Sequence, residues 1–142
     1  MEGALGKCCQ MAIKMARIYC VDGNIGSGKT TVLRELSSRG CTVVEEDVAS
    51  WQPYLTKFYS DPTRWSFTLQ MEILQSLIST QFKGERVFVE RDPFACNIFT
   101  LNAVKMEFMT NLEYDLFCKC KDLMTSWTPT LRFVLAVPVN EC

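Results

Sequence analysis

The chain has 142 residues, with 15 Lys and Arg against 16 Asp and Glu, which gives a formal net charge of -1. This length suits one domain with its own core and is too short for two. The near-neutral charge speaks against a nucleic-acid partner, and no apolar run is long enough to span a membrane. The chain contains no His, which removes Ser-His and Cys-His nucleophilic catalysis.

The first 17 residues are expected to form a flexible leader, and residues 18–142 the folded domain. Lys7, Lys14 and Arg17 alternate there with small and apolar residues, which faintly resembles a mitochondrial transit peptide but lacks serine. We therefore expect a cytoplasmic protein, with mitochondrial import as the alternative. The 8 cysteines include no C-x-x-C pair, so we expect reduced thiols rather than disulfides or a zinc site.

Strands and helices are predicted to alternate, as they do around a parallel sheet. The predicted strands are Ile18–Asp22, Thr42–Glu45, Arg86–Glu90 and Leu131–Val137. The predicted helices are Thr30–Arg39, a long helix from Asp61-Pro62 to Gly84, one from Asp92-Pro93, and one from Asn111 to Trp127. A loop that contains Pro53 is expected after the second strand. Aspartate followed by proline is typical of a helix start.

The long helix carries apolar residues at helical spacing, which predicts a core-facing stripe of Leu69, Ile73, Leu74, Leu77, Ile78 and Phe82. The last predicted strand is followed by no segment long enough for a covering helix. We therefore expect an uncovered apolar face of Leu131, Phe133, Leu135 and Val137, and the chain looks cut short. The fold class predicted is a three-layer α/β/α P-loop NTPase with a mostly parallel sheet, its last strand and lid missing.

Residues 23–30 read Gly-Asn-Ile-Gly-Ser-Gly-Lys-Thr, a complete G-x-x-x-x-G-K-[ST] phosphate-binding loop between a predicted strand and a helix. Backbone N–H groups of such a loop cradle phosphate oxygens, and the helix N-terminus adds partial positive charge. The expected ATP-binding residues are Gly23, Asn24, Ile25, Gly26, Ser27, Gly28, Lys29, Thr30 and Thr31. Lys29 would reach the β- and γ-phosphates, and the Thr30 hydroxyl would bind Mg²⁺.

Three further clusters follow strands, where open α/β sheets place their ligands. The segment Glu45-Glu46-Asp47 offers an acid that could take a proton from a hydroxyl, and Trp51 offers a ring that could pack on a flat ligand. The alternative is that the segment is a solvated acidic turn and Trp51 a core residue. Gln70 can pair with a nucleobase edge or simply lie exposed on its helix. Glu90 and Arg91 could serve Mg²⁺ and a phosphoryl group, or form a structural ion pair.

Taken together, these residues resemble the deoxyribonucleoside kinase family, from about Ile18 to Cys142. The glycine loop matches almost letter for letter. The segments Glu46–Trp51, Tyr59–Trp65 and Glu90-Arg91 match the family's Glu-Pro-Val-x-x-Trp, Tyr-x-Asp-Pro-x-x-Trp and Glu-Arg-Ser patterns. Asp47 and Asp92 replace the family's proline and serine; Asp92-Pro93 is closer to viral thymidine kinases.

The resemblance implies ATP and Mg²⁺ as cofactors, and phosphorylation of a deoxynucleoside at its 5′-hydroxyl in nucleotide salvage, with a pyrimidine favoured. Glu46 would be the general base, Arg91 would sit near the transferred phosphoryl group together with Lys29, and Glu90 and Thr30 near Mg²⁺. Substrate would contact Trp51, Tyr59 at the 3′-hydroxyl, Gln70 at the base, and Phe99, whose spacing differs by one residue. The family is commonly dimeric, which makes a homodimer the state to test.

Two other functions stay open on the sequence. A nucleoside monophosphate kinase would share the glycine loop but needs arginines for the acceptor phosphate, and Glu46, Trp51 and Gln70 suit an uncharged nucleoside better. A non-catalytic nucleotide-binding form is the second alternative. The family continues into an arginine-rich lid and a fifth strand, and this chain does not contain them.

Overall fold

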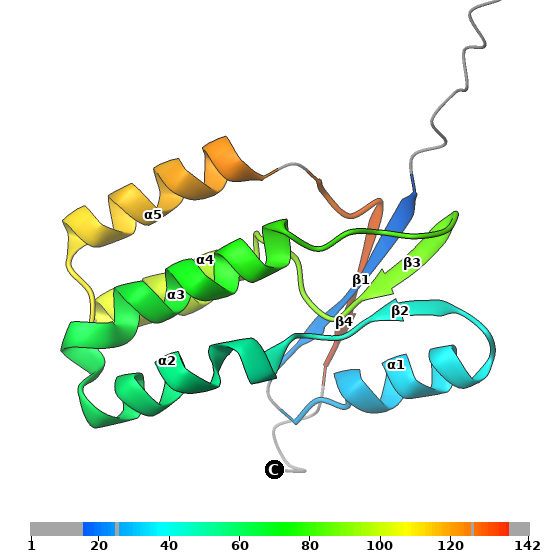
Figure 1. The fold of residues 1–142 in the computed structure, drawn as a ribbon, viewed down its shortest axis with the longest axis horizontal. Coiled ribbons are helices and arrows are strands. Elements are labelled where there is room, and N and C mark those ends of the chain that lie inside the picture. The colour runs from blue at the N-terminus through cyan, green and yellow to red at the C-terminus, as the bar shows by residue number, and fades with distance from the viewer. Residues whose placement is uncertain (1–15, 25, 126, 137–142) are drawn as a thin grey trace, which may run out of the picture.

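A computed structural model describes residues 16–24, 26–125 and 127–136. The predicted leader lies outside the described residues, except for Ala16 and Arg17. The elements in chain order (Figure 1) are β1 (Arg17–Gly23), α1 (Lys29–Ser38), β2 (Thr42–Val44), α2 (Val48–Ser60), α3 (Pro62–Ile78), β3 (Arg86–Val89), α4 (Cys96–Lys105), α5 (Asn111–Met124) and β4 (Leu131–Leu135).

The four strands form one parallel sheet in the order β2-β3-β1-β4. Figure 1 shows α1 on one side of the sheet and α2 to α5 on the other, which confirms the predicted three-layer α/β fold. Because the strands are parallel, their carboxyl ends meet at one edge of the sheet. The segments that follow β1, β2 and β3 therefore converge at that edge. No helix over the described residues is long and apolar enough to cross a membrane.

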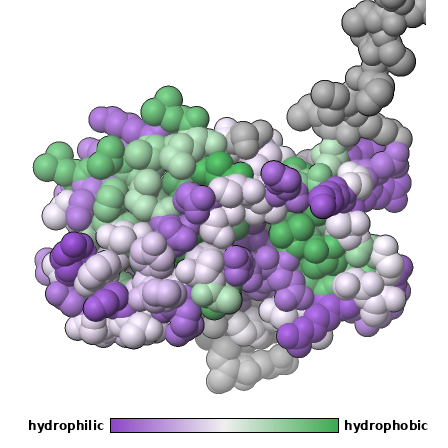
Figure 2. All heavy atoms as spheres, viewed as in Figure 1, coloured by the Kyte–Doolittle hydropathy of each residue, from purple (hydrophilic) through white to green (hydrophobic). Residues whose placement is uncertain are grey.

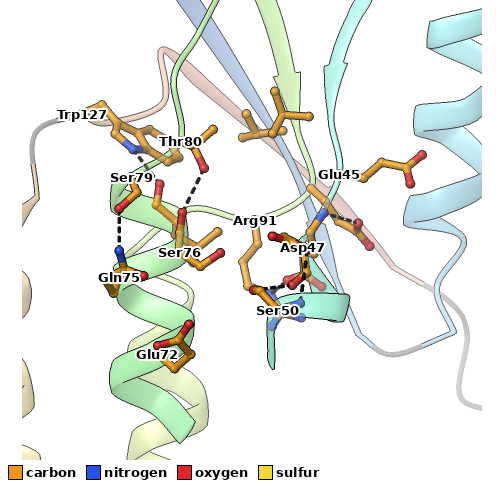
Figure 3. Close-up of a pocket in the computed structure, with 15 residues that line it drawn as sticks. Glu45, Asp47, Ser50, Glu72, Gln75, Ser76, Ser79, Thr80, Arg91 and Trp127 are labelled. Atoms are coloured by element: carbon orange, nitrogen blue, oxygen red, sulfur yellow. Dashed lines mark hydrogen bonds and ion pairs between the residues drawn. The ribbon is translucent and has the colours of Figure 1, made fainter. Parts of the chain in front are cut away.

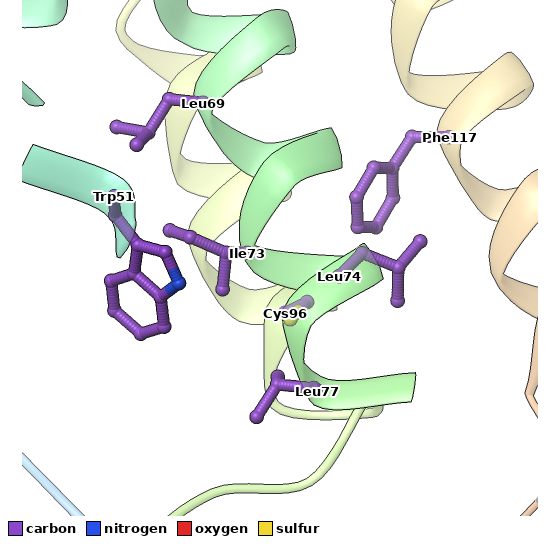
Figure 4. Packing of buried hydrophobic residues seen from close by; sticks show 7 residues of the cluster. All are labelled: Trp51, Leu69, Ile73, Leu74, Leu77, Cys96 and Phe117. Carbon is purple, nitrogen blue, oxygen red and sulfur yellow. The ribbon is translucent and has the colours of Figure 1, made fainter. Parts of the chain in front are cut away.

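The segment with Pro53 was expected as a loop, and this prediction is wrong: it is the helix α2. Asp47 caps it by accepting the Ser50 N–H at 3.3 Å. Pro53 removes one helical hydrogen bond. The packing of α2 against α3 offsets that loss, because Trp51 is only 5% exposed and lies beside Ile73 of α3 (Figure 4).

Helix α3 starts as predicted, since the Asp61 carboxylate accepts the Arg64 N–H at 3.2 Å and Pro62 follows it. It ends at Ile78 instead of Gly84. Phe82 therefore leaves the predicted helical stripe. It packs edge-on against Trp127 at 4.9 Å between ring centroids, so a tertiary contact replaces the expected helical turn.

Helix α4 begins at Cys96, later than the Asp92-Pro93 start predicted for it. The Asp92 carboxylate does act as a cap, but of the turn that precedes the helix: its Oδ1 accepts the Ala95 N–H at 2.9 Å. The prediction that Asp92 acts as a cap is therefore confirmed, and the predicted start of the helix at this residue is wrong.

Helix α5 is capped by Thr110 and not by Asn111, which is its first residue. Thr110 and Glu113 form a reciprocal capping box: the Glu113 N–H reaches Thr110 Oγ1 at 3.2 Å, and the Thr110 N–H reaches Glu113 Oε2 at 2.8 Å. The helix ends at Met124, before the predicted Trp127.

The main core lies among the helices and consists of Trp51, Leu69, Ile73, Leu74, Leu77, Cys96 and Phe117 (Figure 4). Most of the predicted α3 stripe is thus confirmed as core. The edge strand β4 exposes Leu131 at 50% and Phe133 at 45%, as expected. Leu135 is half-buried, and Val137 lies outside the described residues.

Candidate active site

The loop between β1 and α1 depends on glycine at its first position. A Cβ on Gly23, whose φ is 149°, would lie 2.6 Å from Ser27 Oγ and 2.7 Å from the Leu135 carbonyl oxygen. Gly28, with φ 92°, sits at the N-cap of α1 in the left-handed region that favours glycine. Ile25 lies outside the described residues. The local sequence therefore builds a tight turn, inside which the Ser27 N–H donates to the Asn24 carbonyl oxygen at 3.1 Å.

Lys29 lies inside this loop. Its ammonium donates to the carbonyl oxygens of Gly23 at 2.7 Å and Asn24 at 2.8 Å, and the residue is 7% exposed. The next side chain, Thr30, donates its hydroxyl to Glu90 Oε1 at 3.4 Å. The cation and the hydroxyl that the motif predicts for phosphate and metal thus lie together at the base of the loop.

Glu90 connects three segments at the carboxyl edge of the sheet. It follows β3, accepts from Thr30 of α1, and its Oε2 accepts the Glu46 N–H at 3.2 Å beyond β2. Hydroxyl and carboxylate oxygens are the hard ligands that Mg²⁺ prefers, and Mg²⁺ usually adds substrate phosphates and water to one or two carboxylates. Within the described ranges no group of three or more His, Cys, Asp or Glu side chains that could hold a metal ion is present.

Glu46 and Arg91 form a half-buried ion pair next to the loop. Arg91 Nε lies 2.9 Å from Glu46 Oε1, and each side chain is 11% exposed. The two atoms are close but not aligned as a hydrogen bond, so the pair is held by charge. The Arg91 guanidinium also lies 4.4 Å from the centroid of the Phe99 ring, a cation–π contact. Phe99 thus touches Arg91 and helps to fix its orientation.

Burial raises the pKa of Glu46 above its ordinary value. Arg91 lowers it, Glu90 raises it and Lys29 lowers it, each by less than burial does. A carboxylate whose pKa is raised is a stronger proton acceptor than one with the ordinary pKa. The positive charges of Arg91 and Lys29 partly offset this rise in the pKa of Glu46.

Two cavities meet at this pair. One, of about 450 Å³, is lined by Gly26, Gly28, Lys29, Thr30, Thr31, Glu46, Glu90 and Arg91. The other, of about 370 Å³ (Figure 3), extends between β2, the start of α2 and the second half of α3, and includes Glu45, Asp47, Ser50, Glu72, Gln75, Ser76, Ser79, Thr80 and Trp127. Glu46, Glu90 and Arg91 line both. Two ligands, one in each cavity, could therefore both reach Glu46.

The structure brings together Lys29, Thr30, Glu46, Glu90 and Arg91, with Phe99 beside Arg91. The remaining candidates are placed elsewhere: Trp51 in the core, Tyr59 77% exposed in the last turn of α2, and Gln70 half-buried on α3. None of these three lines either cavity.

The amide that lines the second cavity is Gln75, whose Nε2 donates to Ser79 Oγ at 2.9 Å. The sequence analysis missed Gln75 and Ser76. Their position on α3, on the polar side of the apolar stripe, is a signal that could have found them.

The geometry defines a class of protein. A glycine loop that follows β1 of a parallel sheet, enters a helix, and carries a buried lysine and a hydroxyl beside a carboxylate is the phosphate-binding site of a P-loop nucleotide-binding protein.

The deoxynucleoside kinase family profile matches residues 19–142, and the chain belongs to this family. It is 34% identical over 87 residues to a thymidine kinase of Ictalurid herpesvirus 1 (strain Auburn), which covers 55% of this chain and 38% of that protein. It is 30% identical over 107 residues to mitochondrial thymidine kinase 2 of Macaca fascicularis, over 68% of this chain and 40% of that protein. The chain thus spans less than half the length of these relatives.

Among solved structures, the fold is similar to a deoxyadenosine kinase from M. mycoides that has dCMP and a flexible dCDP bound. The TM-score is 0.77 at 19% sequence identity, and the match covers 87% of this chain and 65% of that one. At this identity the likeness establishes the fold.

Proposed function

We propose that the protein transfers the γ-phosphoryl group of ATP to the 5′-hydroxyl of a deoxynucleoside, with a pyrimidine such as thymidine or deoxycytidine favoured. The observation that carries this proposal is the Glu46–Arg91 pair at 2.9 Å, whose side chains line both cavities. A hydroxyl presented from one cavity would meet a phosphoryl group held in the other. Glu46 would accept the hydroxyl proton, and Arg91 would offset charge on the phosphoryl group in transfer.

ATP and Mg²⁺ are proposed at the glycine loop. Ser27 Oγ is buried and has no hydrogen-bond partner among the described residues, and a phosphate oxygen would supply one. The Lys29 ammonium would exchange its contacts with the loop carbonyls for phosphate oxygens. Thr30 and Glu90 would hold Mg²⁺, which supplies positive charge to the phosphates when bound.

The acceptor contacts implied by the family stay proposals. Trp51 Nε1 is a buried donor without a partner among the described residues, and a ligand that reached this core ring would supply an acceptor. Gln70 would orient the base, Tyr59 the 3′-hydroxyl and Phe99 the base from its place beside Arg91. Tyr59 would need to move inward, because its ring is 77% exposed.

The charge of the second cavity favours an uncharged acceptor over a nucleoside monophosphate. Arg91 is the single cation among its lining residues, against the acids Glu45, Glu46, Asp47, Glu72 and Glu90. A phosphate placed there would be repelled. This supports a deoxynucleoside kinase against the monophosphate kinase alternative.

A homodimer is also proposed. Large apolar side chains are exposed on α4, at its C-cap and on α5: Ile98, Leu101, Met106, Leu112, Leu116 and Leu123. Figure 2 shows hydrophobic surface over α5. Burying such side chains in a subunit contact removes apolar surface from water. Sedimentation of the 142-residue chain, with Leu116→Lys as the comparison, tests it: a wild-type dimer that becomes a monomer supports the contact.

A cytoplasmic location, with mitochondrial import as the alternative, is tested by cell fractionation.

The experiment for the function is phosphoryl transfer from ATP to each deoxynucleoside and each deoxynucleoside monophosphate, followed by product chromatography. We expect transfer to the nucleosides, loss of transfer with Lys29→Ala, and pyrimidines favoured over purines. Transfer to the monophosphates alone would overturn the acceptor assignment. Calorimetric binding of ATP without any transfer would indicate the non-catalytic alternative.

The base-recognition role is tested with a matched pair on one helix, Gln70→Ala and Gln75→Ala. If Gln70 orients the base, its variant raises KM and weakens discrimination among bases, whereas the Gln75 variant does neither. The reverse result would place the base in the second cavity. Equal losses for every deoxynucleoside in the Gln70 variant would indicate a packing role.

A further inference from the structure

Asp92, the residue after Arg91, carries a buried charge whose partner comes from the far end of the chain. It is 0% exposed, and its Oδ2 accepts a hydrogen bond from Arg132 Nη2 of β4. Its Oδ1 accepts the Ala95 N–H at 2.9 Å. One oxygen thus binds the turn before α4 and the other binds the edge strand. A buried carboxylate without a partner costs several kcal/mol, so the pair constrains where this turn can lie.

The same edge strand touches the phosphate loop. In the parallel register, Arg132 pairs with Cys20 and Leu135 pairs with Gly23. The Leu135 carbonyl oxygen lies 2.7 Å from the point where a Cβ on Gly23 would stand. Strand β4 therefore packs against Gly23 of the loop through Leu135 and binds Asp92 through Arg132.

On the other side, Asp92 directly follows Arg91, so the position of one sets the backbone of the other. The Arg91 side chain is then fixed by Glu46 at 2.9 Å and by the Phe99 ring at 4.4 Å. A shift of the turn would move Arg91 away from both. The contacts run without a break from the phosphate loop through β4, Arg132 and Asp92 to Arg91.

We propose that Arg132 is a positioning residue: through Asp92 it holds Arg91, and with it Glu46, in the geometry that phosphoryl transfer from the glycine loop requires. This inference rests on the proposed function. A simple ion pair that only fastens β4 to the sheet is the competing account, and replacing such a pair by apolar residues is often neutral for stability. The test therefore needs a readout that stability alone does not change.

The readout is the NMR signal of the Arg91 Nε–H group, identified by its loss in Arg91→Lys, together with kcat and KM. In Arg132→Leu we expect the signal to move to the position of a free guanidinium. We expect kcat to fall by about 10- to 100-fold, because a misplaced group of this kind costs that much, with KM for ATP within about threefold. Arg86→Leu, at the opposite end of β3, is the control and should change neither.

A second variant keeps the test decisive if Arg132→Leu unfolds. Asp92→Ser with Arg132→Leu removes both charges, and a serine hydroxyl can still accept the Ala95 N–H. We expect this double variant to recover thermal stability while the Arg91 signal and kcat stay altered. A folded variant with an unchanged Arg91 signal overturns the proposal. If wild-type protein transfers no phosphoryl group, the proposed function fails, and the Arg91 signal still reports whether Arg132 positions Arg91.

Discussion

Replacing Glu46 by Gln keeps the shape of the side chain and removes the charge that faces Arg91 at 2.9 Å. A neutral amide cannot take the proton of an attacking hydroxyl, so we expect kcat to fall by about 10²- to 10⁴-fold. At about 1.36 kcal/mol for each factor of ten, this is about 3–5 kcal/mol of lost transition-state stabilisation. KM for the deoxynucleoside should change little, because the amide fills the same space.

The same substitution also changes how the stability depends on pH, because burial raises the pKa of Glu46. The folded protein then holds this proton more tightly than the unfolded chain does. The stabilisation is fully present below the unfolded pKa, about 4.3 for glutamate, and is lost as the pH rises through the raised folded pKa. Wild-type protein should lose stability across that window, and the Glu46→Gln protein should not.

Initial rates of phosphoryl transfer and thermal unfolding are measured from about pH 4 to about pH 9, so that the range begins below the unfolded pKa of glutamate, about 4.3. The control is Glu45→Gln, because Glu45 is an exposed acid on the same segment. We expect the wild-type kcat to rise with pH as Glu46 loses its proton, and the residual rate of the variant to be flat. Turnover of Glu46→Gln within two- or threefold of wild type would refute the reasoning and move the role to Glu45 or Asp47.

Three further predictions concern binding, packing and thiol reactivity. Lys29→Ala should weaken ATP binding in calorimetry by about 10- to 150-fold, the loss of one contact to a charged group, and unchanged affinity would contradict the phosphate role. Leu74→Ala should lower the free energy of unfolding in urea by about 2–5 kcal/mol, because Leu74 is 0% exposed; a loss below about 1 kcal/mol would mean that the site collapses around the gap. Burial raises the pKa of Cys20 and of Cys96 to about 12, so both should resist alkylation of the folded protein near neutral pH, while the partly exposed Cys41 reacts. Equal labelling of the three would show that these strands and helices open readily.

The features that could be predicted from the sequence of this protein are those that depend on residues close together in the chain. The glycine loop is encoded within eight residues, because the turn needs glycine at Gly23 and the helix must start directly after it. The alternation of strands and helices, which indicates a parallel sheet, and most of the core stripe of α3 also follow from local apolar patterning. The strand order β2-β3-β1-β4 does not follow from it. Glu46, Glu90 and Arg91 could be placed at one edge because each follows a strand.

Long-range packing decided the rest. Pro53 argues locally against a helix, yet α2 forms because burying Trp51 against Ile73 outweighs one missing hydrogen bond. The pair of Asp92 and Arg132 joins residues 40 positions apart, and no local pattern marks it. Such contacts depend on how elements meet in space, and the free energy that selects them is gained only when distant surfaces are buried together. The sequence by itself therefore determined the phosphate loop, whereas only the tertiary structure decided how the acceptor side is held against it.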